Sequence, residues 1–341
     1  MYEDFYKLTA KPFSLNPDPS FYYGSKEHNR VLAYLRYGIN QGEGFIVVSG
    51  DIGAGKTTLI GALFEELAQT EDIIAAQLVT TQLEPDDLLR MVSGSFGLSY
   101  KGISKSELLK GIEIFLLAQA KEGKRVLLIV DEAQNLQHHS LEELRMLSNF
   151  QKGKHCLLQS FLLGQAEFRD TLRAPNQEQF RQRIIASYHL GPMDKSESKH
   201  YIEHRLKVAG WRGDPHFANE VFTEIYKHTN GIPRRINTLC DRILLFTYAE
   251  ESHDVTVDTV KAVVNELDEE IHFNRDNDVQ AINNTNESSS QTPQPLPSIK
   301  RVKLSGTPEE QIAQLEQRVI YLESIIDKAQ DLVKTLLTKS E

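Results

Sequence analysis

The sequence contains few of the features that mark secreted, membrane-embedded or metal-bound proteins. Its 341 residues include only two cysteines, Cys156 and Cys240, and both lie within apolar runs. This usage favours buried thiols in a reducing compartment over a disulfide framework or a metal site. No run approaches the roughly 18 apolar residues that a membrane helix needs, and the N-terminus lacks the order of a signal peptide. We therefore expect a cytoplasmic protein with no membrane span.

Positive charge is also scarce. The chain has 38 lysines and arginines against 48 acids, a formal net charge of -10. Proteins that coat nucleic acid neutralise its phosphates with clustered lysines and arginines. The charge balance therefore argues against bulk nucleic-acid binding and leaves only a local basic patch open.

What the sequence does contain is an alternation of short apolar runs and helical patterns. Runs rich in β-branched residues separated by helices predict a parallel sheet covered on both faces, which is a doubly wound α/β fold. The expected strands are 45–49, 73–79, 126–130, 157–163 and 184–190, and the expected helices are 56–69, 85–96, 105–121, 140–150 and 166–172.

Composition divides the chain into successive segments. Residues 1–43 are rich in aromatics and proline and predict an extended arm and a helix near 28–41, packed against the domain that follows. Residues 44–192 form the expected sheet domain, and 193–272 contain only helical patterns, which indicates a small helical lid domain. Hydrophobic packing is the expected use of arm aromatics such as Phe13, with contact to a nucleotide base as the alternative.

The C-terminal part changes character twice. Residues 273–308 are rich in Asn, Ser, Gln, Thr and Pro, which predicts a disordered linker. Residues 309–338 carry β-branched residues at one heptad position and mainly leucine at the other, a pattern that favours a parallel two-stranded coiled coil. A single amphipathic helix docked on a partner or on its own domain is the alternative.

A phosphate-binding motif follows the first expected strand. Gly50–Thr57 has the pattern Gly-x4-Gly-Lys-Thr, with a strand before it and an apolar helix after it. In this context the loop N–H groups and the helix N-terminus face phosphates, and Lys56 reaches the β and γ phosphates of ATP. The Thr57 hydroxyl is the expected magnesium ligand. The residues expected to bind the nucleotide are Gly50, Asp51, Ile52, Gly53, Ala54, Gly55, Lys56, Thr57 and Thr58.

Two acids end the strand expected at 126–130. In an open parallel sheet, ligands sit at the carboxyl ends of the strands, so Asp131 and Glu132 are delivered beside the phosphate loop. We expect Asp131 to hold Mg²⁺, directly or through water, and Glu132 to orient and deprotonate the attacking water. Such an acid pair is a weak signal alone and a strong one beside the loop.

Phosphoryl transfer also needs positive charge as the γ-phosphate departs, and arginine usually supplies it. Arg181 and Arg183 precede the fifth expected strand and could face the nucleotide of a neighbouring subunit. Arg234 opens a lid helix and could reach the phosphates of its own chain. A solvated or salt-bridged arginine is the alternative at each position.

Taken in order, these motifs resemble a known family. The sequence is similar to the AAA ATPases of the general-secretion type. The matching segments are PFSLNPDPSFYYGSKEH, LRYGINQGEGFIVVSGDIGAGKTTL, VLLIVDEAQNL, LEELRMLSNFQ, LLQSFLLGQAEFRDTL, QFRQRI and GIPRRINTLCDR. The resemblance covers residues 1 to about 270 and is strongest to the ATPase of exosortase (PEP-CTERM) and exopolysaccharide export loci in bacteria. It implies a P-loop AAA-type sheet domain with a helical lid, and ATP and Mg²⁺ as cofactors.

The resemblance also implies roles for single residues. Gln165 matches the polar sensor after the fourth strand, Arg181 and Arg183 match the arginine-finger region, and Arg234 matches the second sensor. Arginine fingers imply a ring and a coiled coil implies pairing, so we expect a homo-oligomer. Better-known secretion members carry a membrane span and a peptidoglycan-binding region after the ATPase part, where this chain has a polar linker and heptads. Envelope anchoring is thereby put in doubt.

The leading hypothesis is an ATP-hydrolysing assembly or regulatory factor of a bacterial envelope export system, with protein partners of that system. A peripheral position at the inner membrane through those partners stays open. The alternative is a DNA-binding ATPase of the transposition-helper class, which shares the DEAQ-type strand end and the GIPRRIN-type helix and finds support in basic stretches such as 300–303. The acidic balance favours export. A tyrosine autokinase is not favoured, because only Tyr321 follows Tyr248.

Overall fold

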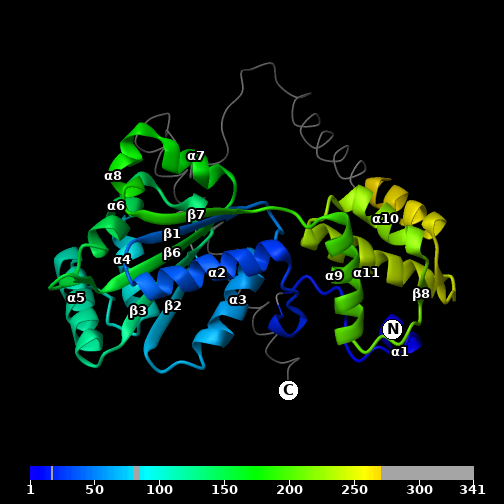
Figure 1. Cartoon of the computed structure of the whole chain (residues 1–341), viewed down its shortest axis with the longest axis horizontal. Coiled ribbons are helices and arrows are strands. Elements are labelled where there is room, and N and C mark those ends of the chain that lie inside the picture. The colour runs from blue at the N-terminus through cyan, green and yellow to red at the C-terminus, as the bar shows by residue number, and fades with distance from the viewer. Residues whose placement is uncertain (17, 80–84, 270–341) are drawn as a thin grey trace, which may run out of the picture. The chain divides into compact units, whose positions relative to one another are not determined.

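A computed structural model describes residues 1–16, 18–79 and 85–269, which belong to one compact unit. Its centre is a five-stranded parallel sheet in the order β2-β3-β6-β1-β7 (Figure 1). The strands are β1 (Phe45–Gly50), β2 (Ile73–Val79), β3 (Arg125–Asp131), β6 (Leu158–Gly164) and β7 (Ile184–Leu190). All five expected strands are confirmed to within a residue or two. The linker and the coiled coil expected for 273–308 and 309–338 lie outside the described residues.

Side chains of the central strands alternate between two cores. Ile46 and Val48 face one side, where they pack with the apolar faces of α2 and α3. Phe45 and Val47 face the other side, where α4, α5 and α6 cover the sheet. The helices are α2 (Lys26–Gln41), α3 (Lys56–Leu67), α4 (Pro85–Ser95), α5 (Lys105–Lys121), α6 (His138–Leu147), α7 (Glu167–Arg173) and α8 (Glu178–Arg181). Burial on both faces explains why the central strands β1, β3 and β6 are mainly apolar.

The helical domain contains α9 (Lys195–Val208), α10 (Asn219–Thr229) and α11 (Pro233–Ala249), drawn together in Figure 1, and a helix described over 257–269. Asn230 ends α10 in a left-handed conformation, and Pro233 starts α11 at a position where no N–H is needed. The expectation of helices alone was wrong here, because β8 (His216–Phe217) and β9 (Asp254–Val255) pair in parallel. Two residues a strand are too few to show a sequence period.

Most of the N-terminal arm packs on the helical domain, not on the sheet domain that follows it in sequence. The arm contains α1 (Tyr2–Phe5) and a short 3-10 turn, η1 (Pro19–Phe21). Tyr2 donates a hydrogen bond to Asp241 Oδ1 at 2.6 Å, and Phe13 is 1% exposed within the core of the helical domain. Phe13 is therefore used for packing and is not available to a nucleotide base.

Several smaller features complete the described part. A hairpin of β4 (Gln151–Lys152) and β5 (His155–Cys156) precedes β6. Cys240 is buried as expected, and burial raises the pKa of its thiol, whereas Cys156 is only half-buried. Among the described residues, no helix has the length and apolar character to cross a membrane.

We expect Phe13→Ala to destabilise the protein by about 3–5 kcal/mol, because it leaves a cavity in the core of the helical domain. Denaturant unfolding followed by circular dichroism measures the change. Leu15→Ala, on the same arm but 56% exposed, is the matched control and should shift stability by less than about 0.5 kcal/mol. Equal effects of the two substitutions would contradict this placement of the arm.

Candidate nucleotide site

The phosphate loop joins β1 to α3, and two of its glycines are required by both conformation and space. Gly53 and Gly55 have φ angles of +80° and +95°, which favour glycine. A Cβ at Gly53 would lie 2.4 Å from the Cβ of Arg234, and one at Gly55 would lie 2.7 Å from His28 Nε2. The Arg234 backbone N–H also donates to the Gly53 carbonyl at 3.1 Å. The loop is therefore held between α2 and the first turn of α11.

Lys56 begins α3 and is nearly buried beneath the loop. Its ammonium donates to the carbonyl oxygens of Gly50 at 2.6 Å and Asp51 at 3.0 Å. Burial lowers the pKa of Lys56, and the charges of Glu132 and Asp131 oppose that shift. Carbonyl partners of this kind can be exchanged for phosphate oxygens, which are stronger acceptors for an ammonium group.

Thr57 and Asp131 are brought together across the sheet edge. The Thr57 hydroxyl donates to Asp131 Oδ2 at 3.1 Å, and the Glu132 N–H donates to Oδ1 at 2.9 Å. Asp131 is 2% exposed, and burial raises the pKa of its carboxyl group. One hydroxyl and one carboxylate suit Mg²⁺, which keeps several waters and uses substrate phosphates as ligands. The described residues contain no cluster of three or more His, Cys, Asp or Glu that would form a larger cage.

Glu132 turns the chain sharply at the end of β3. Its φ of 54° lies in the left-handed region, where a residue other than glycine is uncommon and often found at functional sites. The carboxylate oxygen Oε2 accepts hydrogen bonds from Gln134 Nε2 at 2.5 Å and from Gln165 Nε2 at 3.3 Å. The structure thus brings the expected base and the expected sensor together, and adds Gln134, which the sequence analysis did not single out.

These groups open on a cavity of about 330 Å³. Loop residues, Glu132 and Gln165 line it on the sheet side, and Arg234 lines it from α11. The arm contributes Tyr22 and Tyr23. Every expected site residue of the sheet edge therefore lies at or beside one cavity, together with Arg234 from the helical domain.

His28 contacts the phosphate loop, and the sequence analysis did not assign it a role. Its Nε2 lies 3.1 Å from the Ala54 carbonyl and its Nδ1 lies 2.6 Å from Ser25 Oγ. The ring must donate from Nε2, because a carbonyl oxygen only accepts, and Nδ1 then accepts from the Ser25 hydroxyl. Burial lowers the pKa of His28. No sequence motif predicts this contact, because His28 and Ala54 are 26 positions apart.

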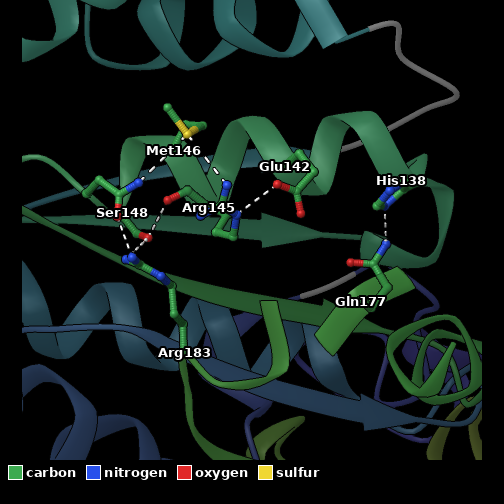
Figure 2. Close-up of polar contacts among 8 residues, drawn as sticks. His138, Glu142, Arg145, Met146, Ser148, Gln177 and Arg183 are labelled. Atoms are coloured by element: carbon green, nitrogen blue, oxygen red, sulfur yellow. Dashed lines mark hydrogen bonds and ion pairs between the residues drawn. The ribbon is translucent and has the colours of Figure 1, made fainter. Parts of the chain in front are cut away.

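Arg181 and Arg183 are not among the residues that line the cavity. Arg181 Nη1 donates to the carbonyls of Leu172 at 2.8 Å and Ala174 at 2.7 Å. Arg183 precedes β7, at the end of the sheet opposite the phosphate loop, and its guanidinium reaches Ser148 after α6 at 3.0 Å and also Asn149 (Figure 2). Neither arginine serves the nucleotide of its own chain in this arrangement, so a finger role would be played in a neighbouring subunit.

Comparison with known proteins agrees with this geometry. Residues 39–172 match the model of the AAA domain. This match includes the phosphate loop, the acid pair Asp131 and Glu132, and Gln165. The fold of the chain is also that of the ORC2 protein of Aeropyrum pernix in ADPNP and ADP complexes, with 17% identity, a TM-score of 0.58 and coverage of 75% of this chain and 71% of that one. Cdc6p of Pyrobaculum aerophilum is similar too, with 14% identity, a TM-score of 0.58 and coverage of 75% of this chain and 70% of that one. At these identities the likeness shows the fold alone.

The chain is also similar to a curated protein of higher sequence identity. The chain is 38% identical over 256 residues to general secretion pathway protein A of Aeromonas hydrophila. The aligned region covers 75% of this chain and 46% of the relative. The chain thus spans less than half of that protein's length. Together with the geometry of the site, the AAA-domain match indicates that the chain hydrolyses ATP.

We expect the nucleotide-free protein to lose stability as the pH falls below about 6.5, the ordinary pKa of histidine. The pKa of His28 is lowered in the folded state, so below that pH the unfolded chain binds a proton that the folded chain does not, and unfolding is favoured. Thermal melts between pH 5 and 8 measure this.

His28→Gln keeps an N–H donor for Ala54 but does not titrate, so its melting temperature should depend less steeply on pH. His155→Gln, in the exposed hairpin, is the matched control and should follow the parent protein. A slope in His28→Gln as steep as that of the parent would exclude His28 as the source.

Proposed function

We propose that the chain acts as an ATP-driven assembly or regulatory factor of a bacterial envelope export system of the general-secretion type. The observation that carries the proposal is the 38% identity over 75% of the chain to general secretion pathway protein A. The sequence resemblance extends the proposal to export linked to exopolysaccharide or exosortase loci. We propose that the protein lies in the cytoplasm and is held at the inner membrane through its protein partners. We also propose that it forms a homo-oligomer.

The residues of the site divide the hydrolytic work. Lys56 would bind the β and γ phosphates, and Thr57 and Asp131 would hold the magnesium ion. When bound, Mg²⁺ would neutralise part of the phosphate charge. Glu132 orients the attacking water and accepts its proton. Gln165 reaches the same carboxylate and lines the cavity, which supports a role in sensing the γ-phosphate.

Arg234 connects the nucleotide to the helical domain. Its backbone donates to Gly53, and its side chain lies against the loop. It also lies in the first turn of α11, whose residues Ile236, Leu239 and Ile243 are buried in the core of the helical domain. A change at the phosphates would therefore move α11 as a rigid element, and partners of the export system would read the new position of the helical domain.

Lys56→Ala should weaken ATP binding by about two orders of magnitude, because charge-assisted bonds to phosphate are each worth about 1.5–3 kcal/mol. Glu132→Gln should bind ATP like the parent but hydrolyse it about 10²- to 10⁴-fold more slowly, since only the base is lost. Nucleotide binding and phosphate release measure the two effects separately. Glu142→Gln, whose carboxylate pairs with Arg145 on α6, is the control. Parental turnover by Glu132→Gln would disprove the assignment of the base.

Arginine fingers should act between subunits. Lys56→Ala and Arg183→Ala should each be nearly inactive, because a finger is worth about 10³–10⁵ in turnover. A mixture of the two should regain activity, because some interfaces then pair an intact Lys56 site with an intact Arg183. The same mixture with Arg181→Ala tests the other candidate, with melting curves to report any loss of its contacts to Leu172 and Ala174. If each mixture is only as active as its two variants measured separately and added together, arginine fingers in this region are excluded.

A further inference from the structure

We propose that Gln134 is a positioning residue for hydrolysis, whose side-chain amide holds the carboxylate of Glu132 and ties it to the end of β6. The inference deepens the proposed function and rests on the role of Glu132 as the base. Gln134 lies in the 3-10 turn η2 (Ala133–Asn135) that follows Glu132.

Both ends of the Gln134 amide are engaged. Nε2 donates to Glu132 Oε2 at 2.5 Å, and Oε1 accepts from the backbone N–H of Gln165 at 2.9 Å. A flipped amide would set its carbonyl against the carboxylate and its NH₂ group against an N–H donor. The two partners therefore fix the orientation of the amide, and only a side chain with a donor and an acceptor on one planar group satisfies both.

The backbone turn makes this contact possible. Glu132 has φ 54° and ψ 38°, and its carbonyl accepts from the N–H of Asn135 at 2.9 Å. This turn folds the chain back so that the side chain two residues later lies against the carboxylate. Glutamate has three side-chain torsions, so without a fixed partner its carboxylate would sample several positions. Misplacement of a reacting group by about 1 Å can cost about 10²-fold in rate.

Gln134 and Gln165 have different positions relative to the nucleotide. Among the described residues, Gln165 and Glu132 line the cavity and Gln134 does not. The bond from Gln165 Nε2 to Glu132 Oε2 is long, at 3.3 Å. Gln165 can turn toward a phosphate and give up its bond to the base, while Gln134 retains its own. Gln165 thus senses the nucleotide, and Gln134 keeps Glu132 in place.

The test compares Gln134→Ala and Gln134→Glu with the parent protein. Gln134→Ala removes the donor, and Gln134→Glu keeps the shape but sets a carboxylate against a carboxylate. We expect the kcat of both variants to fall about 10- to 100-fold while ATP affinity changes by less than about twofold, because the position of the base affects the chemical step and not the binding of ATP. Gln137→Ala, exposed three residues along the chain, should keep the parental kcat. Melting curves are recorded for each protein.

Glu132→Gln is measured in the same assay to separate this inference from the proposed function. If Glu132→Gln stalls and both Gln134 variants keep the parental kcat, the inference is wrong and the base assignment stands. If kcat, ATP affinity and melting temperature of the Gln134 variants all fall together, Gln134 is a structural residue and the inference is also wrong. If Glu132→Gln turns over normally, both the base assignment and the inference fail.

Discussion

Added side chains at Gly53 and Gly55 would collide with two parts of the chain that are distant in sequence. Arg234, from the first turn of α11, lies against Gly53, and His28, from α2, lies against Gly55. The loop can adopt its phosphate-binding path only because these positions carry no Cβ and accept positive φ angles. The same close approach fixes how α2 and α11 meet the loop. The geometry of the whole site therefore depends on the contacts at these two glycines.

Two charged groups beside the loop are buried, and a bound nucleotide would reduce the free-energy cost of that burial. Burial disfavours the charged forms of both Lys56 and Asp131, as the lowered pKa of the first and the raised pKa of the second show. Phosphates beside Lys56 and a divalent cation beside Asp131 would each favour the charged form again. The free energy of binding then adds to the stability of the folded state. A site that is costly when empty is suited to a protein whose conformation must respond to its nucleotide.

Much of the fold could be predicted because its signals are local. The five strands are six or seven residues long and mainly apolar, and the phosphate loop and acid pair are contiguous motifs with physical meaning. The helix break before Pro233 is likewise predicted by neighbouring residues. These elements needed no knowledge of tertiary contacts.

What was missed depends on contacts between distant residues or on elements too short to have a period. His28 acts on Ala54, and the arm aromatics pack into helices about 200 residues away, so no sequence window contains both partners. Gln134 was within the quoted acid motif, but its role requires the position of Gln165, which directly follows the neighbouring strand β6. Arg181 and Arg183 stay predictions for a related reason. Their proposed partner is another subunit, and the contacts within one chain show only what holds them in place.

The placement of the arm has a consequence for how the helical domain can move. Arg205 of α9 donates to the carbonyl of Pro12 and, at 3.0 Å, to the hydroxyl of Tyr201, which donates to Asn237 of α11 at 2.8 Å. These groups are buried, and leaving one unsatisfied costs about 1–3 kcal/mol, more for a charged group. The arm must therefore move together with α9 and α11. The segments that join this unit to the sheet domain lie near residues 23–26 and 191–194. There Lys26 N–H donates to Glu197 at 2.8 Å, so the start of α2, which positions His28 under the phosphate loop, is tied to the start of α9.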